Sequence, residues 1–183
     1  MGLLTIIKKQ KIKDKEIRIL TLGLDNSGKT TIIKKLLNED TNIISPTMGF
    51  QINSVSYKDY TFNMWDIGGQ TSLRTFWGNY FDKTDLVIWV IDGLNIERLN
   101  ESFKELQDKI IQQDRLNGIY LAVLINKIDL IPEGESIDLK KKVNDLLQLE
   151  KQIPLDKFQI ELVSGKSGQG ITQVLDWIIT RDF

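Results

Sequence analysis

The stretch GLDNSGKTT, residues 23–31, follows the apolar run IRILTL and decides the fold. It fits the pattern G-x-x-x-x-G-K-[ST], with Gly23, Gly28, Lys29 and Thr30 at the fixed positions. In this pattern the backbone N–H groups of the loop and the N-terminus of the following helix bind phosphate oxygens. A glycine-rich turn without a ligand would need neither the lysine nor the threonine. The stretch therefore predicts a phosphate-binding loop between a strand and a helix.

Outward from this loop, short apolar runs alternate with helical patterns along the chain. Strands are predicted over residues 17–22, 86–91, 119–125 and 158–163, and a hairpin over 51–57 and 60–66. A helix is predicted over 29–37, and three later helices have core-facing stripes at Leu99, Phe103, Leu106 and Ile110, at Leu139, Val143, Leu146 and Leu147, and at Ile171, Val174, Leu175 and Ile178. This alternation predicts an α/β fold with a mostly parallel sheet and helices on both faces.

The composition excludes several kinds of chemistry. The chain of 183 residues contains neither Cys nor His, which removes disulfides, Cys/His zinc sites, histidine bases and cysteine-linked lipids. A net charge of −1 does not suggest a nucleic-acid partner. The longest apolar run, residues 119–125, is far shorter than the roughly 20 residues that span a bilayer. Because charges begin at Lys8, we also expect no secretory signal and a cytoplasmic location.

A segment for base recognition follows one of the predicted strands. NKID, residues 126–129, begins where the strand 119–125 ends, and open α/β sheets bind ligands at the carboxyl ends of their strands. The Asp129 carboxylate can accept hydrogen bonds from two neighbouring donors, which guanine offers and adenine lacks. Lys127 can lay its stem along the base. SGK, residues 164–166, could donate a backbone N–H to guanine O6, although this sequence is also ordinary turn chemistry.

Two further segments suit a switch that senses a γ-phosphate. In WDIGGQ, Asp66 would reach Mg²⁺ through water, the Gly69 N–H can meet the γ-phosphate, and Gln70 can orient an attacking water. In SPTMGF, the Thr47 hydroxyl could join that of Thr30 on Mg²⁺. Loss of the γ-phosphate would then release both segments. The predicted nucleotide-binding residues are Gly23, Leu24, Asp25, Asn26, Ser27, Gly28, Lys29, Thr30, Thr31, Thr47, Gly69, Asn126, Lys127, Asp129, Ser164, Gly165 and Lys166.

In this order, GLDNSGKTT, PTMGF, WDIGGQ and NKID resemble the Arf family of small GTPases, and the similarity extends over nearly the whole chain. MGLLTI, QTSLRTFWGNYF and VIWVID most resemble the Arf-like 2 branch, with Arf-like 3 next. The resemblance implies a Ras-like P-loop GTPase fold with six strands, one of them antiparallel. It also implies a GTP/GDP cycle with Mg²⁺ and slow hydrolysis, which an activating protein (GAP) accelerates.

The resemblance further implies which residues contact partners and where this chain departs from its relatives. Phe50, Trp65 and Tyr80 correspond to an aromatic triad that binds effectors, and we interpret Arg74 as effector-facing too. Ser27 and Gly165 stand where close relatives have Ala, and Ile128 where they have Gln. We expect Asp25 to place negative charge near the γ-phosphate.

Residues 1–15 are predicted to form an amphipathic helix ahead of a GTPase domain at 16–183. Such a helix can attach to a membrane, with Gly2 myristoylated, or enter the groove of a partner protein. The acylation pattern requires Ser or Thr at position 6, where this chain has Ile6. We therefore favour capture by a protein, with weak or absent membrane contact. The contacting residues would be Leu3, Leu4 and Ile7.

The leading hypothesis is a monomeric cytoplasmic switch, with association to microtubules or the centrosome as one option. The resemblance implies carriers of lipidated proteins, Arf-like 2 binder proteins and tubulin-folding cofactors as partners. The alternatives are a membrane coat recruiter, a P-loop kinase for small molecules and a GTP-binding scaffold without hydrolysis. GDP that co-purifies with the protein would favour the switch, whereas bound ATP would favour the kinase.

Overall fold

The computed structural model describes residues 2–183, with the side chains of residues 8 and 11–13 left out of the description. The strands are β1 (Glu16–Gly23), β2 (Phe50–Tyr57), β3 (Tyr60–Ile67), β4 (Leu86–Asp92), β5 (Tyr120–Asn126) and β6 (Phe158–Leu162). The α-helices are α1 (Leu3–Asp14), α2 (Lys29–Leu36), α3 (Thr71–Arg74), α4 (Leu99–Leu106), α5 (Glu133–Leu147) and α6 (Ile171–Ile179). The predicted strands and hairpin recur with ends shifted by one residue at most.

One six-stranded sheet organises the chain, in the order β2-β3-β1-β4-β5-β6. The β2–β3 pair is antiparallel and every other pair is parallel. The carboxyl ends of β1, β3, β4 and β5 therefore lie at one edge of the sheet, and the motifs GLDNSGKTT, WDIGGQ and NKID lie at the ends of β1, β3 and β5. The predicted fold class is confirmed.

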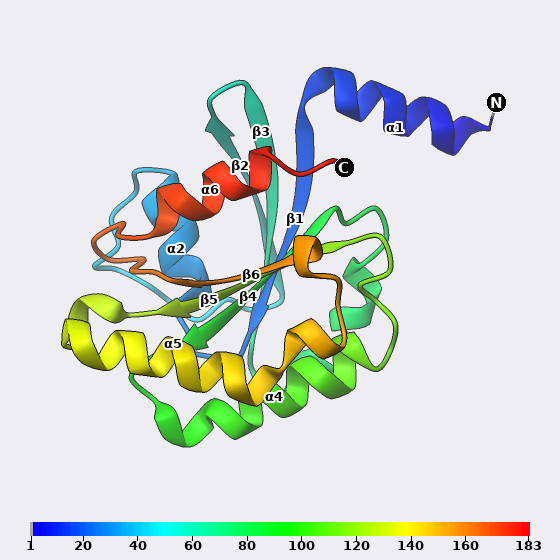
Figure 1. The fold of residues 1–183 in the computed structure, drawn as a ribbon. Helices are drawn as coiled ribbons and strands as arrows, with labels where there is room; N and C mark the ends of the chain where they lie inside the picture. The colour runs from blue at the N-terminus through cyan, green and yellow to red at the C-terminus, as the bar shows by residue number, and fades with distance from the viewer. Residues whose placement is uncertain (1) are drawn as a thin grey trace.

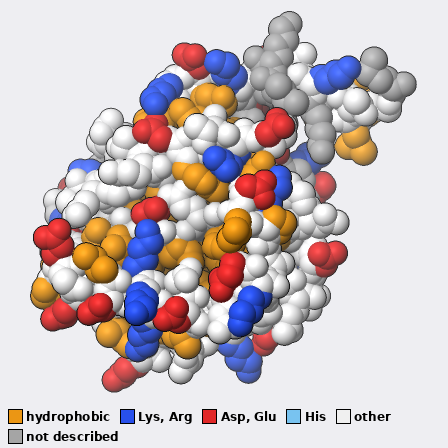
Figure 2. Space-filling view, in the orientation of Figure 1, with side chains coloured by type: hydrophobic (Ala, Val, Ile, Leu, Met, Phe, Trp, Pro, Cys, Tyr) orange, Lys and Arg blue, Asp and Glu red, His pale blue; other side chains and the backbone are white. Residues whose placement is uncertain are grey.

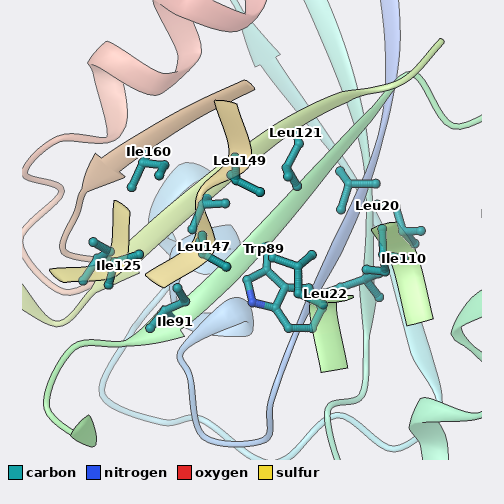
Figure 3. Close-up of a cluster of buried hydrophobic side chains, with 14 of the residues drawn as sticks. Leu20, Leu22, Trp89, Ile91, Ile110, Leu121, Ile125, Leu147, Leu149 and Ile160 are labelled. Atoms are coloured by element: carbon teal, nitrogen blue, oxygen red, sulfur yellow. The ribbon is translucent and has the colours of Figure 1, made fainter. Parts of the chain in front are cut away.

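Helices lie on both faces of the sheet (Figure 1), and an apolar layer fills the space between the sheet and the helices on each face. One contains the side chains of α4 and α5 packed on the sheet, with Trp89 of β4 in its centre, as Figure 3 shows. The other lies beneath α2 and α6. The predicted stripes on α4 and α6 face these layers, but Leu146 is 48% exposed and its assignment to the core was wrong. The spacing of four between Leu139, Val143 and Leu147 turns those three inward, which leaves Leu146 on the flank of α5.

Helix α1 extends away from the sheet at the N-terminal end of β1 (Figure 1). Leu3 and Leu4 are 74% and 73% exposed, so the apolar side of the helix is left uncovered. Within residues 2–183, no helix combines the length and the apolar character needed to cross a bilayer. On the face drawn in Figure 2, acidic and basic side chains are interspersed and form no broad region of one sign.

Candidate nucleotide-binding site

The conformation of the loop between β1 and α2 requires a glycine at position 28. Gly28 has φ +94°, and a Cβ built on it would lie 2.2 Å from Asn126 Nδ2. Both the backbone angle and the contact exclude a side chain at this position. Asn126 Nδ2 donates to the Ser27 carbonyl at 3.0 Å, so the glycine allows β5 to brace the loop directly.

Lys29 is the charged group at the centre of the loop. Its side chain is 6% exposed, and its Nζ donates to the carbonyls of Gly23 (2.9 Å) and Leu24 (2.7 Å). Burial lowers the pKa of Lys29 to about 8, and the carboxylate of Asp66 acts in the opposite direction. A phosphate group beside Nζ would supply the negative charge that favours the protonated amine.

Three oxygen-bearing side chains converge next to this lysine. Thr30 Oγ1 donates to Asp66 Oδ2 at 2.6 Å, Thr47 Oγ1 donates to the same atom at 3.1 Å, and the two hydroxyls lie 2.9 Å apart. Burial raises the pKa of the Asp66 carboxyl. Its Oδ1 is buried and accepts no hydrogen bond from the residues that the structure describes.

This oxygen set fits Mg²⁺, which prefers hydroxyl, carboxylate, phosphate and water oxygens. Across the described residues there is no group of three or more His, Cys, Asp or Glu that could hold a metal. The protein would therefore offer Mg²⁺ only part of its coordination shell: the Thr30 and Thr47 hydroxyls, with the Asp66 carboxylate able to hold a coordinated water. Phosphate and water oxygens would complete it, as is usual for Mg²⁺ at nucleotide sites.

The base segment after β5 meets the loop after β6. Ser164 Oγ donates to Asp129 Oδ1 at 2.6 Å, and the exposed remainder of that carboxylate can accept from a ligand. Lys127 Nζ donates to the carbonyl of Asn26 (2.8 Å) and to Asp92 (2.7 Å), which directs its stem across the site. Lys166, at the rim, donates to Asn42.

The backbone N–H of the 164–166 loop that was expected to bind guanine O6 already donates a hydrogen bond within the protein. The Gly165 N–H donates to Asn126 Oδ1 at 2.9 Å, so this amide already has an acceptor. Sequence alone could not show this, because the two residues lie 39 positions apart. The Asn126 amide therefore joins the phosphate loop and the 164–166 loop through its two ends.

The WDIGGQ segment lies against the phosphate loop. The N–H of Asp25 donates to the Gly69 carbonyl at 3.1 Å, and a Cβ on Gly69 would come within 2.4 Å of the Gly23 carbonyl oxygen. Gln70 follows at the start of α3, half-buried, on the wall of the cleft.

Arg74 does not face effectors, and that interpretation was wrong. Its side chain is 3% exposed, and its Nε donates to the Gly69 carbonyl at 2.9 Å. Its two terminal nitrogens contact Glu101 (2.8 Å), Glu105 (3.3 Å) and Asp25 (3.2 Å). Burial of the guanidinium is tolerated because three carboxylates and a carbonyl surround it.

The expectation about Asp25 also needs correction. Its carboxylate accepts from Arg98 at 2.9 Å and from Arg74, so both arginines neutralise it. The hydrogen bond from Arg98 is the main cause that lowers the pKa of Asp25. Arg98 also binds Glu101 on α4. We name Asp25, Arg74, Arg98, Glu101 and Glu105 the ion cluster. The sequence did not predict the roles of Arg98 and the two glutamates, because 73 residues separate Arg98 from Asp25.

Ten of the predicted residues line one cleft of about 430 Å³, whereas Gly23, Leu24, Asn126, Asp129 and residues 164–166 are not part of its walls. It is lined by Asp25, Asn26, Gly28, Lys29, Thr30, Thr31, Ile44, Ser45, Pro46, Thr47, Gly68, Gly69, Gln70 and Lys127. Ser27 lies elsewhere: its side chain is 1% exposed and lines a separate small cavity against the loop.

The aromatic triad is assembled, whereas the residues of α1 lie apart from it. Phe50 stacks on Trp65 with ring centroids 5.6 Å apart, and Tyr80 is tilted against both. The Arg18 guanidinium also lies over the Trp65 ring, 4.1 Å from its centroid. Phe50 is 47% exposed, so the triad offers an apolar surface beside the switch segments.

A P-loop on a Ras-like sheet, with a guanine-type base segment and a threonine–aspartate cluster beside the lysine, defines the class of small GTPases. The profile of the ADP-ribosylation factor family matches residues 3–181. The chain belongs to this family, and it is a GTP-binding switch that hydrolyses GTP.

Named relatives lie in two branches of the family. ADP-ribosylation factor-like protein 2 of Dictyostelium discoideum is 44% identical over 98% of this chain and 94% of the relative. The protein of the same name from Arabidopsis thaliana is 42% identical with the same coverage. ADP-ribosylation factor-like protein 3 of Chlamydomonas reinhardtii is 42% identical over 99% of both chains.

A solved structure with a similar fold carries a nucleotide analogue. It is the Arl6 BBS3 small GTPase of Trypanosoma brucei with bound GppNp, at TM-score 0.72 and 28% identity over 90% of this chain and 95% of that one.

Proposed function

We propose that this GTPase detects the γ-phosphate through the closure of Thr47 on Thr30 and Asp66. The observation that carries the proposal is the triangle of contacts at 2.6, 2.9 and 3.1 Å, which joins the segment before β2 to the phosphate loop and to β3. Bound Mg²⁺ would supply charge neutralisation for the phosphates. Thr30 and Thr47 would ligate it, and Asp66 would hold one of its waters. Without the γ-phosphate, the segment that carries Thr47 would no longer be held against Thr30 and Asp66 and would open.

Gln70 is the proposed catalytic residue, which orients the attacking water at the mouth of the cleft. No arginine among the described residues points from the chain into the γ-phosphate end of the cleft, since Arg74 and Arg98 are engaged in the ion cluster. Hydrolysis would therefore be slow until an activating protein supplies an arginine, which accelerates related enzymes by about 10³–10⁵-fold.

Single-turnover hydrolysis of GTP tests this role. Gln70→Leu should abolish the acceleration by an Arf-family activating protein while the affinity for GDP stays within about twofold of wild type. Gln173→Leu, an exposed glutamine on α6, is the matched control and should hydrolyse normally. An accelerated rate that survives in Gln70→Leu would remove Gln70 from the mechanism.

As partners we propose carriers of lipidated proteins, Arf-like 2 binder proteins and tubulin-folding cofactors, in the cytoplasm. The similarity to Arf-like protein 2 over nearly the full chain supports this choice, as do the exposed Phe50 and the uncovered Leu3 and Leu4. The test is a pull-down that compares Gln70→Leu, loaded with GTP, against Thr30→Asn, loaded with GDP. Myristate on Gly2 in the native protein would instead favour membrane attachment.

A further inference from the structure

A second, much smaller cavity lies against the phosphate loop, and Asp25 lines both it and the cleft. Its volume is about 10 Å³, which is close to the minimum that holds one water molecule. Its walls come from the phosphate loop, the end of β4 and the start of α4. The polar residues among them are Asp25, Ser27, Asp92, Asn95, Arg98 and Ser102.

The Ser27 hydroxyl is the unexplained group in this cavity. The side chain is 1% exposed, and Oγ has no hydrogen-bond partner in the part of the chain that the structure describes. It lies over Gly23, where an added Cβ would be 3.2 Å from Oγ. A buried hydroxyl without a partner is unfavourable, and such groups in proteins are commonly satisfied by an internal water.

Other residues that line the cavity carry groups that can bond a water. Ser102 Oγ of α4 accepts a hydrogen bond from Trp89 Nε1 at 3.1 Å, which leaves its own hydrogen free to donate. The Asp25 carboxylate and the Arg98 guanidinium, 2.9 Å apart, add charged groups beside the cavity. The site therefore combines room for one water with several polar groups, which is what an internal water requires.

We propose that one buried water bridges Ser27 Oγ to these polar groups, and that Ser27 is thereby a positioning residue for the phosphate loop. The Ser27 carbonyl accepts from Asn126 Nδ2, so its backbone is already fixed from the side of the base segment. The water fixes the same residue from the side of α4. With the loop held on both sides, phosphate groups leave slowly; this consequence rests on the proposed nucleotide site.

Release of mant-GDP from the full chain tests the consequence. Ser27→Ala should release the nucleotide about three to ten times faster, the range expected from one lost hydrogen bond. The matched control is Ser136→Ala, since Ser136 is also buried but bonds within α5, away from the cleft. Ser102→Ala should add little to Ser27→Ala, because both variants break one bridge. Equal release rates for Ser27→Ala and wild type would overturn the positioning role.

The water itself is tested separately, by a high-resolution crystal structure of the GDP-bound wild-type protein. We expect a water density peak within hydrogen-bond distance of Ser27 Oγ, and its loss in Ser27→Ala. A dry cavity, or a Ser27 hydroxyl that donates to a carbonyl of the chain, would overturn the inference. A wild-type protein that binds no guanine nucleotide would instead refute the proposed site, while the cavity could still be inspected in the nucleotide-free crystal.

Discussion

Replacing Arg74 by Met removes the buried guanidinium at the centre of the ion cluster while keeping an unbranched side chain of similar length. Four hydrogen bonds are lost, to the Gly69 carbonyl and to Asp25, Glu101 and Glu105. Three carboxylates are then left close together: Arg98 still pairs with Asp25 and Glu101, and Lys109 lies 3.9 Å from Glu105.

The size of the effect follows from burial. Removing one partner of a buried ion pair costs about 3–5 kcal/mol. The carboxylates retain part of their hydration, since their side chains are 21% to 44% exposed, and the Gly69 carbonyl keeps its bond from the Asp25 N–H. We therefore expect Arg74→Met to lower the free energy of unfolding by about 2–4 kcal/mol.

Urea unfolding at fixed GDP and Mg²⁺ concentrations measures this, because bound nucleotide contributes to the apparent stability. The control is Arg181→Met. The guanidinium of Arg181 lies 4.9 Å from the Trp177 ring centroid and donates to the carbonyls of Trp177 and Asp156 and to the Thr180 hydroxyl near the surface, so its loss should cost about 1 kcal/mol. If Arg74→Met lowered the free energy of unfolding no more than Arg181→Met does, the ion cluster would not stabilise the contact between the WDIGGQ segment and α4.

Three further predictions concern pH, packing and metal. Arg98 lowers the pKa of both Asp25 and Glu101, so the stability that it contributes is present above about pH 4 and is lost as the pH falls further. The difference in the free energy of unfolding between wild type and Arg98→Met, measured from urea midpoints, should therefore be constant from about pH 5 to 8 and shrink below about pH 4. Gly28→Ala should weaken mant-GDP binding at least about tenfold, since the new Cβ meets Asn126, whereas Gly134→Ala, with open space around it, should leave the titration unchanged. Chelation of Mg²⁺ by EDTA should speed mant-GDP release, and Thr30→Ala should release mant-GDP quickly with or without EDTA; a wild-type rate insensitive to EDTA would contradict the metal ligands that we propose.

The fold could be predicted because its information is local. Apolar runs such as 86–91 and 119–125 leave few alternatives to buried parallel strands, and the phosphate loop identifies itself by spacing alone. Most residues of the cleft could be predicted for the same reason, since three of the motifs lie directly at the ends of strands, and Thr47 lies in the segment just before β2.

What sequence could not predict was the pairing between distant polar side chains. Arg74 looks like a surface residue until Glu101 and Glu105, 27 and 31 positions later, are found beside it. In the same way, the Gly165 N–H looked available for a ligand because nothing in the order of residues links it to Asn126. Polar partners have no periodicity, so tertiary structure alone reveals them.

The double attachment of Asn126 has a thermodynamic consequence. Its amide donates to the phosphate loop at the Ser27 carbonyl and accepts from the Gly165 N–H, so a displacement of either loop is felt by the other. Coupling between two binding subsites must be reciprocal. To the extent that occupying the base subsite makes the phosphate loop bind its anion more tightly, occupying the phosphate loop must tighten the base subsite by the same factor. Asn126 contributes to that coupling together with the bond from Lys127 to the Asn26 carbonyl.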